Sequence, residues 1–156
     1  MRTLNAAAFR RVCAAVACAL AVPAGPAFAG FLSSTGPVIA MLGSELFVGE
    51  AEGFLDGSGT LAMRSKANAA VSCSGQFTSS AKLGGAGQLE CSDGRNATFK
   101  FQRLTLRSGH GTGESARGLL SFTYGLSLDA SRPYLTLPTG KKLEQNGAKL
   151  QLADLL

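Results

Sequence analysis

The sequence has no tryptophan and a single histidine, and charged residues make up only 16% of its 156 positions. Soluble domains carry roughly 25% charged residues, so long solvated or disordered tracts are not expected here. Heptad repeats and charge blocks are also missing, which argues against a coiled coil or a fibrous protein. The apolar share of 46% in a chain of this length instead suits one domain with a buried core.

The first 29 residues have the composition of a cleaved secretory signal. Its three basic residues are Arg2, Arg10 and Arg11. They precede an apolar stretch, 12–22, that is too short to span a bilayer as a helix. Small residues at Ala27 and Ala29 occupy the two positions that a signal peptidase reads. We therefore expect cleavage after Ala29, export to the periplasm or the medium, and a mature domain over residues 30–156.

Two other interpretations of this leader are possible, and two functions are made improbable by its removal. In the first interpretation the protein is lipid-anchored at Cys18, since residues 15–18 weakly resemble a lipobox. In the second the segment is no signal and forms a buried N-terminal helix. Removal of the three leader arginines lowers the formal net charge from +5 to +2, so a nucleic-acid partner is not expected. Beyond the leader, no run approaches about 18 apolar residues, so we expect no membrane span in the mature chain.

Two cysteines, Cys73 and Cys91, follow the leader, and in an exported chain such a pair most often forms a disulfide. A pair of free thiols is the alternative. Tetrahedral zinc needs four ligands, which one distant histidine cannot complete, so no metal is expected. If the cysteines face each other on antiparallel strands, Gly75 and Gly87 each meet a large apolar partner. The register that follows pairs Gly75 with Leu89, Phe77 with Gly87 and Ser79 with Gly85.

Apolar and polar residues alternate with a period of two over most of the mature chain, most clearly over 71–79 and 120–128. This is the pattern of half-buried strands. Asp93-Gly94 between two such segments is typical of a tight hairpin turn, and Gly43 lies in a second expected turn. We therefore predict an all-β domain, either a small antiparallel β-barrel or a β-sandwich of about seven to nine strands. A filled core and an internal cavity are both compatible with this pattern.

The alternation changes face after the strand that contains Phe99 and Phe101, because Leu104 and Leu106 have the opposite parity. A strand changes faces only through an extra residue, so we predict a bulge at residues 102–103.

Basic residues near this bulge are expected to form a strip on the outer face of one sheet: Lys100, Arg103, Arg107 and Arg117. From Asp129 onward we expect a polar tail that is anchored by a last strand around Leu150.

The glycine-rich segment 109–118 is the candidate binding region, interpreted as a loop held by two strands. The candidate residues are Gly109, His110, Gly111, Gly113 and Arg117. Residues 111–116 match a G-x-G-x-x-A dinucleotide fingerprint, but a strand follows almost at once and leaves no room for the helix that the motif requires. No nucleotide or other cofactor is therefore expected.

Three functions are compatible with these observations. We expect a non-enzymatic exported β-domain that binds an envelope or extracellular partner, either a protein or a glycan. The first alternative is a barrel that carries a small apolar ligand. The second is a hydrolase that uses His110, although no serine elbow motif and no catalytic set of residues is present.

Overall fold

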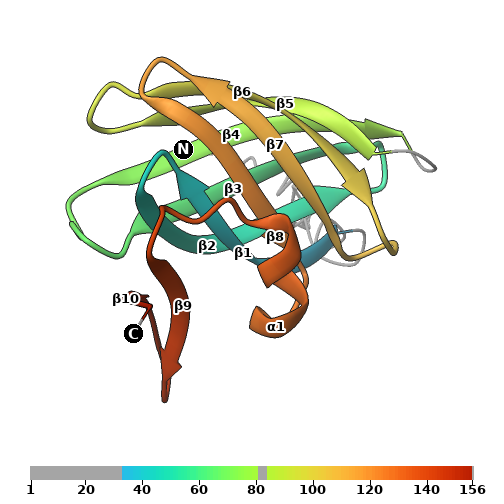
Figure 1. Cartoon of the computed structure of the whole chain (residues 1–156). Helices are drawn as coiled ribbons and strands as arrows, with labels where there is room; N and C mark the ends of the chain where they lie inside the picture. Colours follow the sequence, from blue (N-terminus) through green and yellow to red (C-terminus); the bar gives the residue numbers. More distant parts are fainter. Residues whose placement is uncertain (1–32, 81–83, 156) are drawn as a thin grey trace, which may run out of the picture.

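The computed structural model describes residues 33–80 and 84–155, so the expected leader, with Cys18 in it, lies outside the described residues. Within these ranges an antiparallel sheet closes on itself into a barrel (Figure 1). The strands are β1 (Ser33–Leu42), β2 (Glu45–Phe54), β3 (Ser58–Ser65), β4 (Ser72–Ser80), β5 (Gly84–Cys91), β6 (Asn96–Arg103), β7 (Gly109–Ser115) and β8 (Gly118–Tyr124).

Each barrel strand pairs with the next one along the chain, and β8 pairs with β1 to close the sheet. At the closure Val38 lies opposite Tyr124 and Leu42 lies opposite Leu120. Closure removes the free strand edges that would otherwise template aggregation. The all-β prediction is confirmed, and of its two architectures the chain adopts the barrel. No helix in the described ranges has the length and apolarity needed to cross a bilayer.

The disulfide and its register are confirmed. Cys73 on β4 is bonded to Cys91 on β5, and the two residues lie directly opposite each other. The predicted pairs of Gly75 with Leu89, Phe77 with Gly87 and Ser79 with Gly85 are all present. The predicted turns also form, with positive φ angles of 62° at Gly43 and 84° at Gly94.

Large and small residues alternate around the inside of the barrel. At one level Phe77, Phe99 and Leu120 are separated by Gly87 and Gly113 on the strands between them. A methyl group on Gly87 would come within 2.4 Å of Phe99 Cζ, so the ring fills the space that a side chain would need. The glycines of the interior are thus packing positions for their aromatic neighbours.

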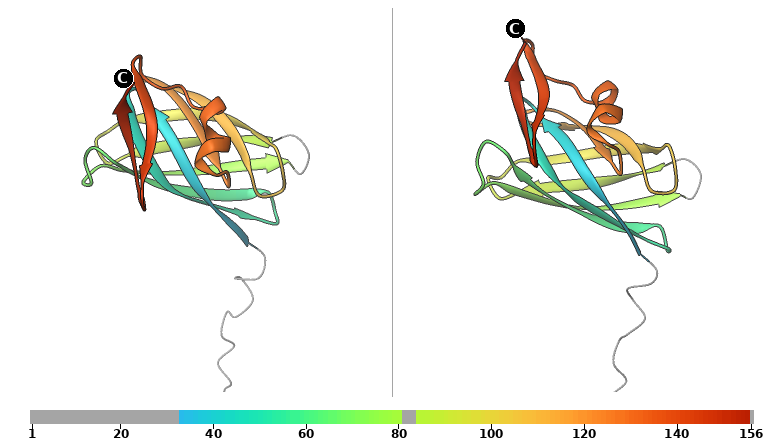
Figure 2. Two further views of the ribbon diagram at one scale, coloured as in Figure 1. Left: turned by 60° about the horizontal axis from the view of Figure 1, so that its bottom comes forward. Right: turned by 90° about the horizontal axis from the view of Figure 1, so that it is seen from below.

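The C-terminal segment covers the outer face of β1 and β8, and Figure 2 shows it on that side of the barrel. It consists of α1 (Leu128–Ser131), η2 (Arg132–Tyr134), β9 (Lys141–Asn146) and β10 (Lys149–Asp154). Met41 and Leu46 on the outer face pack with Leu135 and Leu143 in a second buried cluster. The expected last strand around Leu150 is confirmed as β10, but the polar character expected for the segment is wrong, because it buries an apolar face.

The bulge predicted at residues 102–103 is wrong. Arg103 at the end of β6 pairs in regular register with Gly109 of β7. The strand simply ends there, and Leu104 and Leu106 are 49% and 80% exposed in the connection to β7. Their change of parity therefore marks the end of a strand.

One end of the barrel is closed by a buried ion-pair cluster. Arg95, which is 9% exposed, forms 2.8 Å ion pairs with Glu45 and Asp93 and lies 5.1 Å from the centre of the Phe47 ring. Burial opposes the charge of Arg95, but the hydrogen bonds to Asp93 and Glu45 outweigh it and raise the pKa of the guanidinium. The hydrogen bond from Arg95 to Asp93 also lowers the pKa of the Asp93 carboxyl group. This end of the barrel is a packed core.

Candidate functional site

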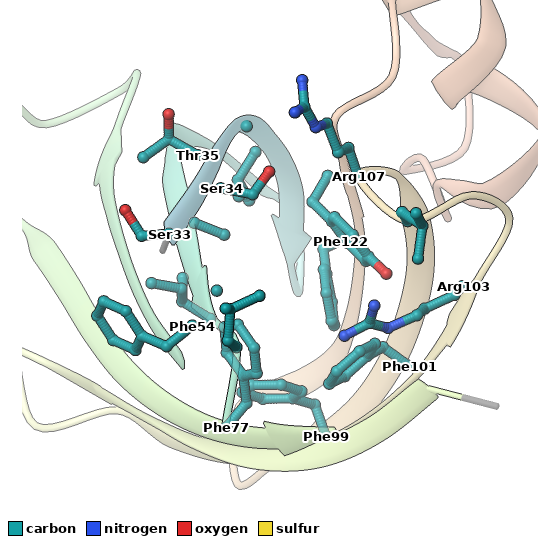
Figure 3. Close-up of a pocket in the computed structure, with 18 residues that line it drawn as sticks. Ser33, Ser34, Thr35, Phe54, Phe77, Phe99, Phe101, Arg103, Arg107 and Phe122 are labelled. Atoms are coloured by element: carbon teal, nitrogen blue, oxygen red, sulfur yellow. The ribbon is translucent and has the colours of Figure 1, made fainter. Parts of the chain in front are cut away.

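The opposite end of the barrel holds a cavity of about 350 Å³, where β1 begins and where β6 and β8 end (Figure 3). This volume lies at the lower end of the roughly 300–1,000 Å³ that small-molecule sites occupy. The inner wall is apolar and includes Val38, Leu61, Phe77, Phe99, Phe101 and Phe122. The sequence left open whether the interior is filled, and the structure shows a core at one end and a cavity at the other.

The phenylalanine rings of the wall support one another. Phe77 meets Phe101 edge to face with ring centres 5.4 Å apart, and Phe99 meets Phe122 in the same way at 5.2 Å. Phe101 also meets Tyr124 at 5.8 Å, again nearly perpendicular. Edge-to-face packing of this kind fixes ring orientation, so the rings hold one another in place along the apolar wall.

The candidate glycines face the barrel interior from β7, behind the aromatic rings, and are not among the residues that line the cavity. Gly109, Gly111 and Gly113 alternate with outward-facing residues, and a methyl group on Gly111 would come within 2.5 Å of Phe122 Cζ. The loop predicted for residues 109–118 is therefore wrong over most of its length, since residues 109–115 form a strand. Aromatic side chains from β6 and β8 occupy the space that side chains at these three positions would need.

Two polar side chains, Arg103 and Tyr124, enter this apolar space. Arg103 Nη2 donates a 2.6 Å hydrogen bond to Ser79 Oγ, and Ser79 Oγ donates in turn to the carbonyl oxygen of Gly57 at 3.2 Å. Arg103 Nε and Tyr124 Oη are buried, and neither has a hydrogen-bond partner among the described residues. Figure 3 shows the Arg103 guanidinium pointing into the cavity, so its expected place on the outer basic strip is wrong.

The electrostatics of Tyr124 follow from this position. Burial raises the pKa of the Tyr124 phenol, because the apolar surroundings disfavour the charged phenolate. The positive charge of Arg103 acts in the opposite direction and lowers the pKa. The net effect is a raised pKa of Tyr124, so its hydroxyl, like that of an ordinary tyrosine, is protonated at neutral pH and able to donate a hydrogen bond.

The mouth of the cavity is more polar than its wall. Ser33, Ser34 and Thr35 at the start of β1 line one side, and Arg107 lies on the other. In Figure 3 the Arg107 guanidinium extends away from the phenylalanine rings. The cavity thus has an apolar interior, a partly buried arginine and tyrosine near its mouth, and a polar rim.

The remaining candidate residues lie away from this cavity. His110 faces outward on β7, where its ring stacks on Tyr134 with centres 4.0 Å apart and an angle of 13° between the planes. Arg117 is exposed in the turn after β7, at the closed end of the barrel, whereas Gly109 is at the open end. His110 thus projects from the opposite face of β7 to the glycines, Arg117 lies in the turn beyond the strand, and binding through these residues stays a prediction.

Sequence reasoning missed Arg103 and Tyr124 as site residues. A signal for both was present, since Arg103 continues the parity of Phe99 and Phe101, and Tyr124 continues that of Phe122. In the part of the chain that the structure describes, no group of three or more histidine, cysteine, aspartate or glutamate side chains is placed to hold a metal ion.

Fold and site together define the class of this protein: a closed antiparallel barrel of eight strands with a disulfide and an apolar interior that opens at one end. Comparisons with protein-family models, with curated proteins and with solved structures find no match.

Proposed function

We propose that the protein is an exported, non-enzymatic binding protein that holds a small, mainly apolar molecule in the open end of its barrel. The observation that carries this proposal is the preformed cavity of about 350 Å³ walled by phenylalanine rings. Removing apolar surface from water is favourable, and most of a small barrel's interior is packed for this reason. The apolar wall of this cavity is not covered by other side chains of the described residues, so a ligand that covers it gains the same free energy.

The compartment is part of the same proposal. The Cys73–Cys91 disulfide is compatible with an oxidising environment, such as the periplasm or the extracellular medium. The leader predicted from the sequence, with its expected cleavage after Ala29, favours export, with the lipid-anchored form at Cys18 as the alternative. A small apolar molecule is poorly soluble in such aqueous compartments, which is where a carrier has a use.

The other two functions gain less from the geometry. Binding of an envelope protein or glycan through residues 109–118 relied on an exposed glycine loop, and these glycines instead pack against rings inside the barrel. Hydrolysis through His110 would need an orienting carboxylate, whereas its contact in the described residues is the Tyr134 ring.

The test uses the absence of tryptophan from the natural sequence. Phe54 lines the cavity near its mouth, so an F54W variant places the only indole of the protein beside the ligand. Titration with decanol, an uncharged molecule with a flexible apolar chain, should shift the indole emission to shorter wavelength and saturate. The concentration is kept below that at which decanol separates from solution.

Two further substitutions in the F54W background make the result specific to the cavity. A51F introduces a ring into the cavity wall and should abolish saturable binding. A116F adds the same ring in the exposed turn after β7, at the closed end of the barrel, and should leave binding unchanged. An emission that does not respond to decanol, or responds equally in both variants, would overturn the proposal.

A further inference from the structure

We infer that the ligand is an amphipathic carboxylate, a monoanion whose head group is bound by Arg103 and Tyr124 while its apolar chain lies among the phenylalanine rings. This inference rests on the proposed function, because it names the chemical class of the molecule that the cavity holds.

The first argument compares Arg103, which is partly buried, with the buried Arg95 at the closed end. Arg95 at the closed end is paired with two carboxylates, Glu45 and Asp93. Arg103 at the open end forms no ion pair within the described ranges, and its one hydrogen bond goes to the neutral hydroxyl of Ser79. A charge that is partly removed from water without an opposite charge is unfavourable, so Arg103 is complementary to an anion from outside the chain.

The second argument is the pair of orphaned polar atoms. Leaving a buried donor without an acceptor costs about 1–3 kcal/mol, and both Arg103 Nε and Tyr124 Oη are in this state with respect to the described residues. Both groups can donate, because the guanidinium carries only N–H groups and a tyrosine hydroxyl carries its proton at neutral pH. Two donors and one positive charge match the two oxygens and single charge of a carboxylate.

The third argument is the placement of these donors on the sheet. Arg103 and Tyr124 both pair with Gly109, so they project into the barrel on either side of a residue that has no side chain. Ser79, held by the carbonyl of Gly57, fixes one end of the guanidinium and leaves Nε directed elsewhere. The head-group site is therefore built from groups whose positions are set by strand pairing and by a hydrogen bond to a third strand.

The polarity of the cavity then sets the direction of the ligand. Phe101 and Phe122 lie one inward-facing position deeper than Arg103 and Tyr124 on the same strands. A carboxylate at the arginine–tyrosine pair places the chain on these rings and the head near the mouth. Arg107 at the rim adds a second positive charge at the entrance, which favours the approach of an anion.

The test compares three probes with the same ten-carbon chain: decanoate, decanol and decylammonium. Isothermal titration calorimetry on the natural mature protein should show that decanoate binds at least about tenfold more tightly than decanol, with decylammonium weakest. The affinity for decanoate should fall as salt is added, whereas that for decanol should not.

Three variants test which residues cause the preference for decanoate over decanol. R103M removes the charge but keeps an unbranched apolar stem, and it should weaken decanoate binding by roughly ten- to hundredfold without changing decanol binding. Y124F removes one hydroxyl and should have a smaller effect of the same kind, which gives an answer even if R103M folds poorly. K100M removes one positive charge from the outer face of the same strand and is the matched control.

The outcomes separate the two levels of the proposal. Equal affinity for decanoate and decanol, or equal losses in R103M and K100M, would overturn the carboxylate inference and leave the apolar cavity as a binding site. If none of the three probes binds to the natural protein, both the proposed binding of an apolar molecule and the inferred carboxylate head group are wrong.

Discussion

Arg103 and Tyr124 enter the barrel from strands on either side of Gly109, which is their common partner in the sheet. A methyl group on Gly109 would approach Tyr124 Oη to 2.5 Å. The candidate head-group site therefore depends on a strand that contributes no side chain of its own at that level. The same relation recurs one level deeper, where Gly111 pairs with both Phe101 and Phe122.

The glycines of β7 should be required for stability. In G111A the new methyl group would lie 2.5 Å from both the Lys100 carbonyl oxygen and Phe122 Cζ, so the ring and the backbone must move. We expect a loss of about 1–3 kcal/mol in the free energy of unfolding, as for other overpacked cores. Urea denaturation followed by circular dichroism measures it.

Gly53 offers a matched control for this substitution. It lies on β2, a methyl group added there would have no atom within 4 Å, and its backbone does not need a positive φ. G53A should therefore leave the unfolding midpoint unchanged or raise it slightly, because alanine restricts the unfolded chain. A destabilisation in G53A as large as that in G111A would contradict the role given to the β7 glycines.

The disulfide should stabilise the barrel through the unfolded state. It links residues 18 positions apart, and closing a loop of this size is worth about 3 kcal/mol in the chain-entropy model. Reduction of the natural protein should lower its free energy of unfolding by about this amount. The C73A/C91A variant should be insensitive to the same reductant, and an equal response in both proteins would assign the effect to the reductant itself.

Much of the strand pairing could be predicted from local chemistry. The pairing of β4 with β5 follows from two cysteines and from glycines that meet large partners, so one register satisfies several requirements together. The Asp93-Gly94 turn is equally local, since it needs only a positive φ at Gly94, which is 84° in the structure. These features depend on residues that are close in sequence or covalently linked.

The cavity and its polar pair depend on closure of the whole barrel, which local patterns do not encode. Glycine is depleted in strands, so the alternating glycines of β7 favour a loop when only the sequence is considered. The predicted bulge places Arg103 outside, although it shares its parity with Phe101. Whether an inward face of phenylalanines fills the interior or lines a cavity is decided by strand number and by partners from distant strands.

The ion-pair cluster at the closed end should contribute measurably to stability. R95M removes a 9% exposed guanidinium and leaves Glu45 without its ion-pair partner. We expect a loss of about 1–3 kcal/mol in the free energy of unfolding. The exposed pair of Arg132 with Asp129 provides the control, and R132M should change stability by less than about 1 kcal/mol. Similar losses in the two variants would show that burial of Arg95 adds nothing.

Tyr124 should titrate at higher pH than an ordinary tyrosine, whose pKa is 10.0, because burial disfavours its phenolate. The protein has two tyrosines and no tryptophan, so Y134F leaves Tyr124 as the single phenol. Its ultraviolet absorbance should report phenolate formation at higher pH in the folded protein than in the same variant unfolded in urea. Coincident titration curves for the folded and unfolded variant would contradict the burial of this hydroxyl.

The raised pKa of Tyr124 also fixes the sign of a pH effect on stability. The folded state holds the phenol proton more tightly than the unfolded chain, so this contribution is complete below pH 10.0 and is lost as the pH rises through the raised pKa. Since the charge of Arg103 lowers the pKa of Tyr124, R103M in the Y134F background should move the titration to still higher pH. K100M, which removes a charge from the outer face of β6, should leave the curve in place. A shift in R103M alone would locate the Arg103 charge beside the Tyr124 hydroxyl, where the carboxylate of a bound ligand would contact both groups.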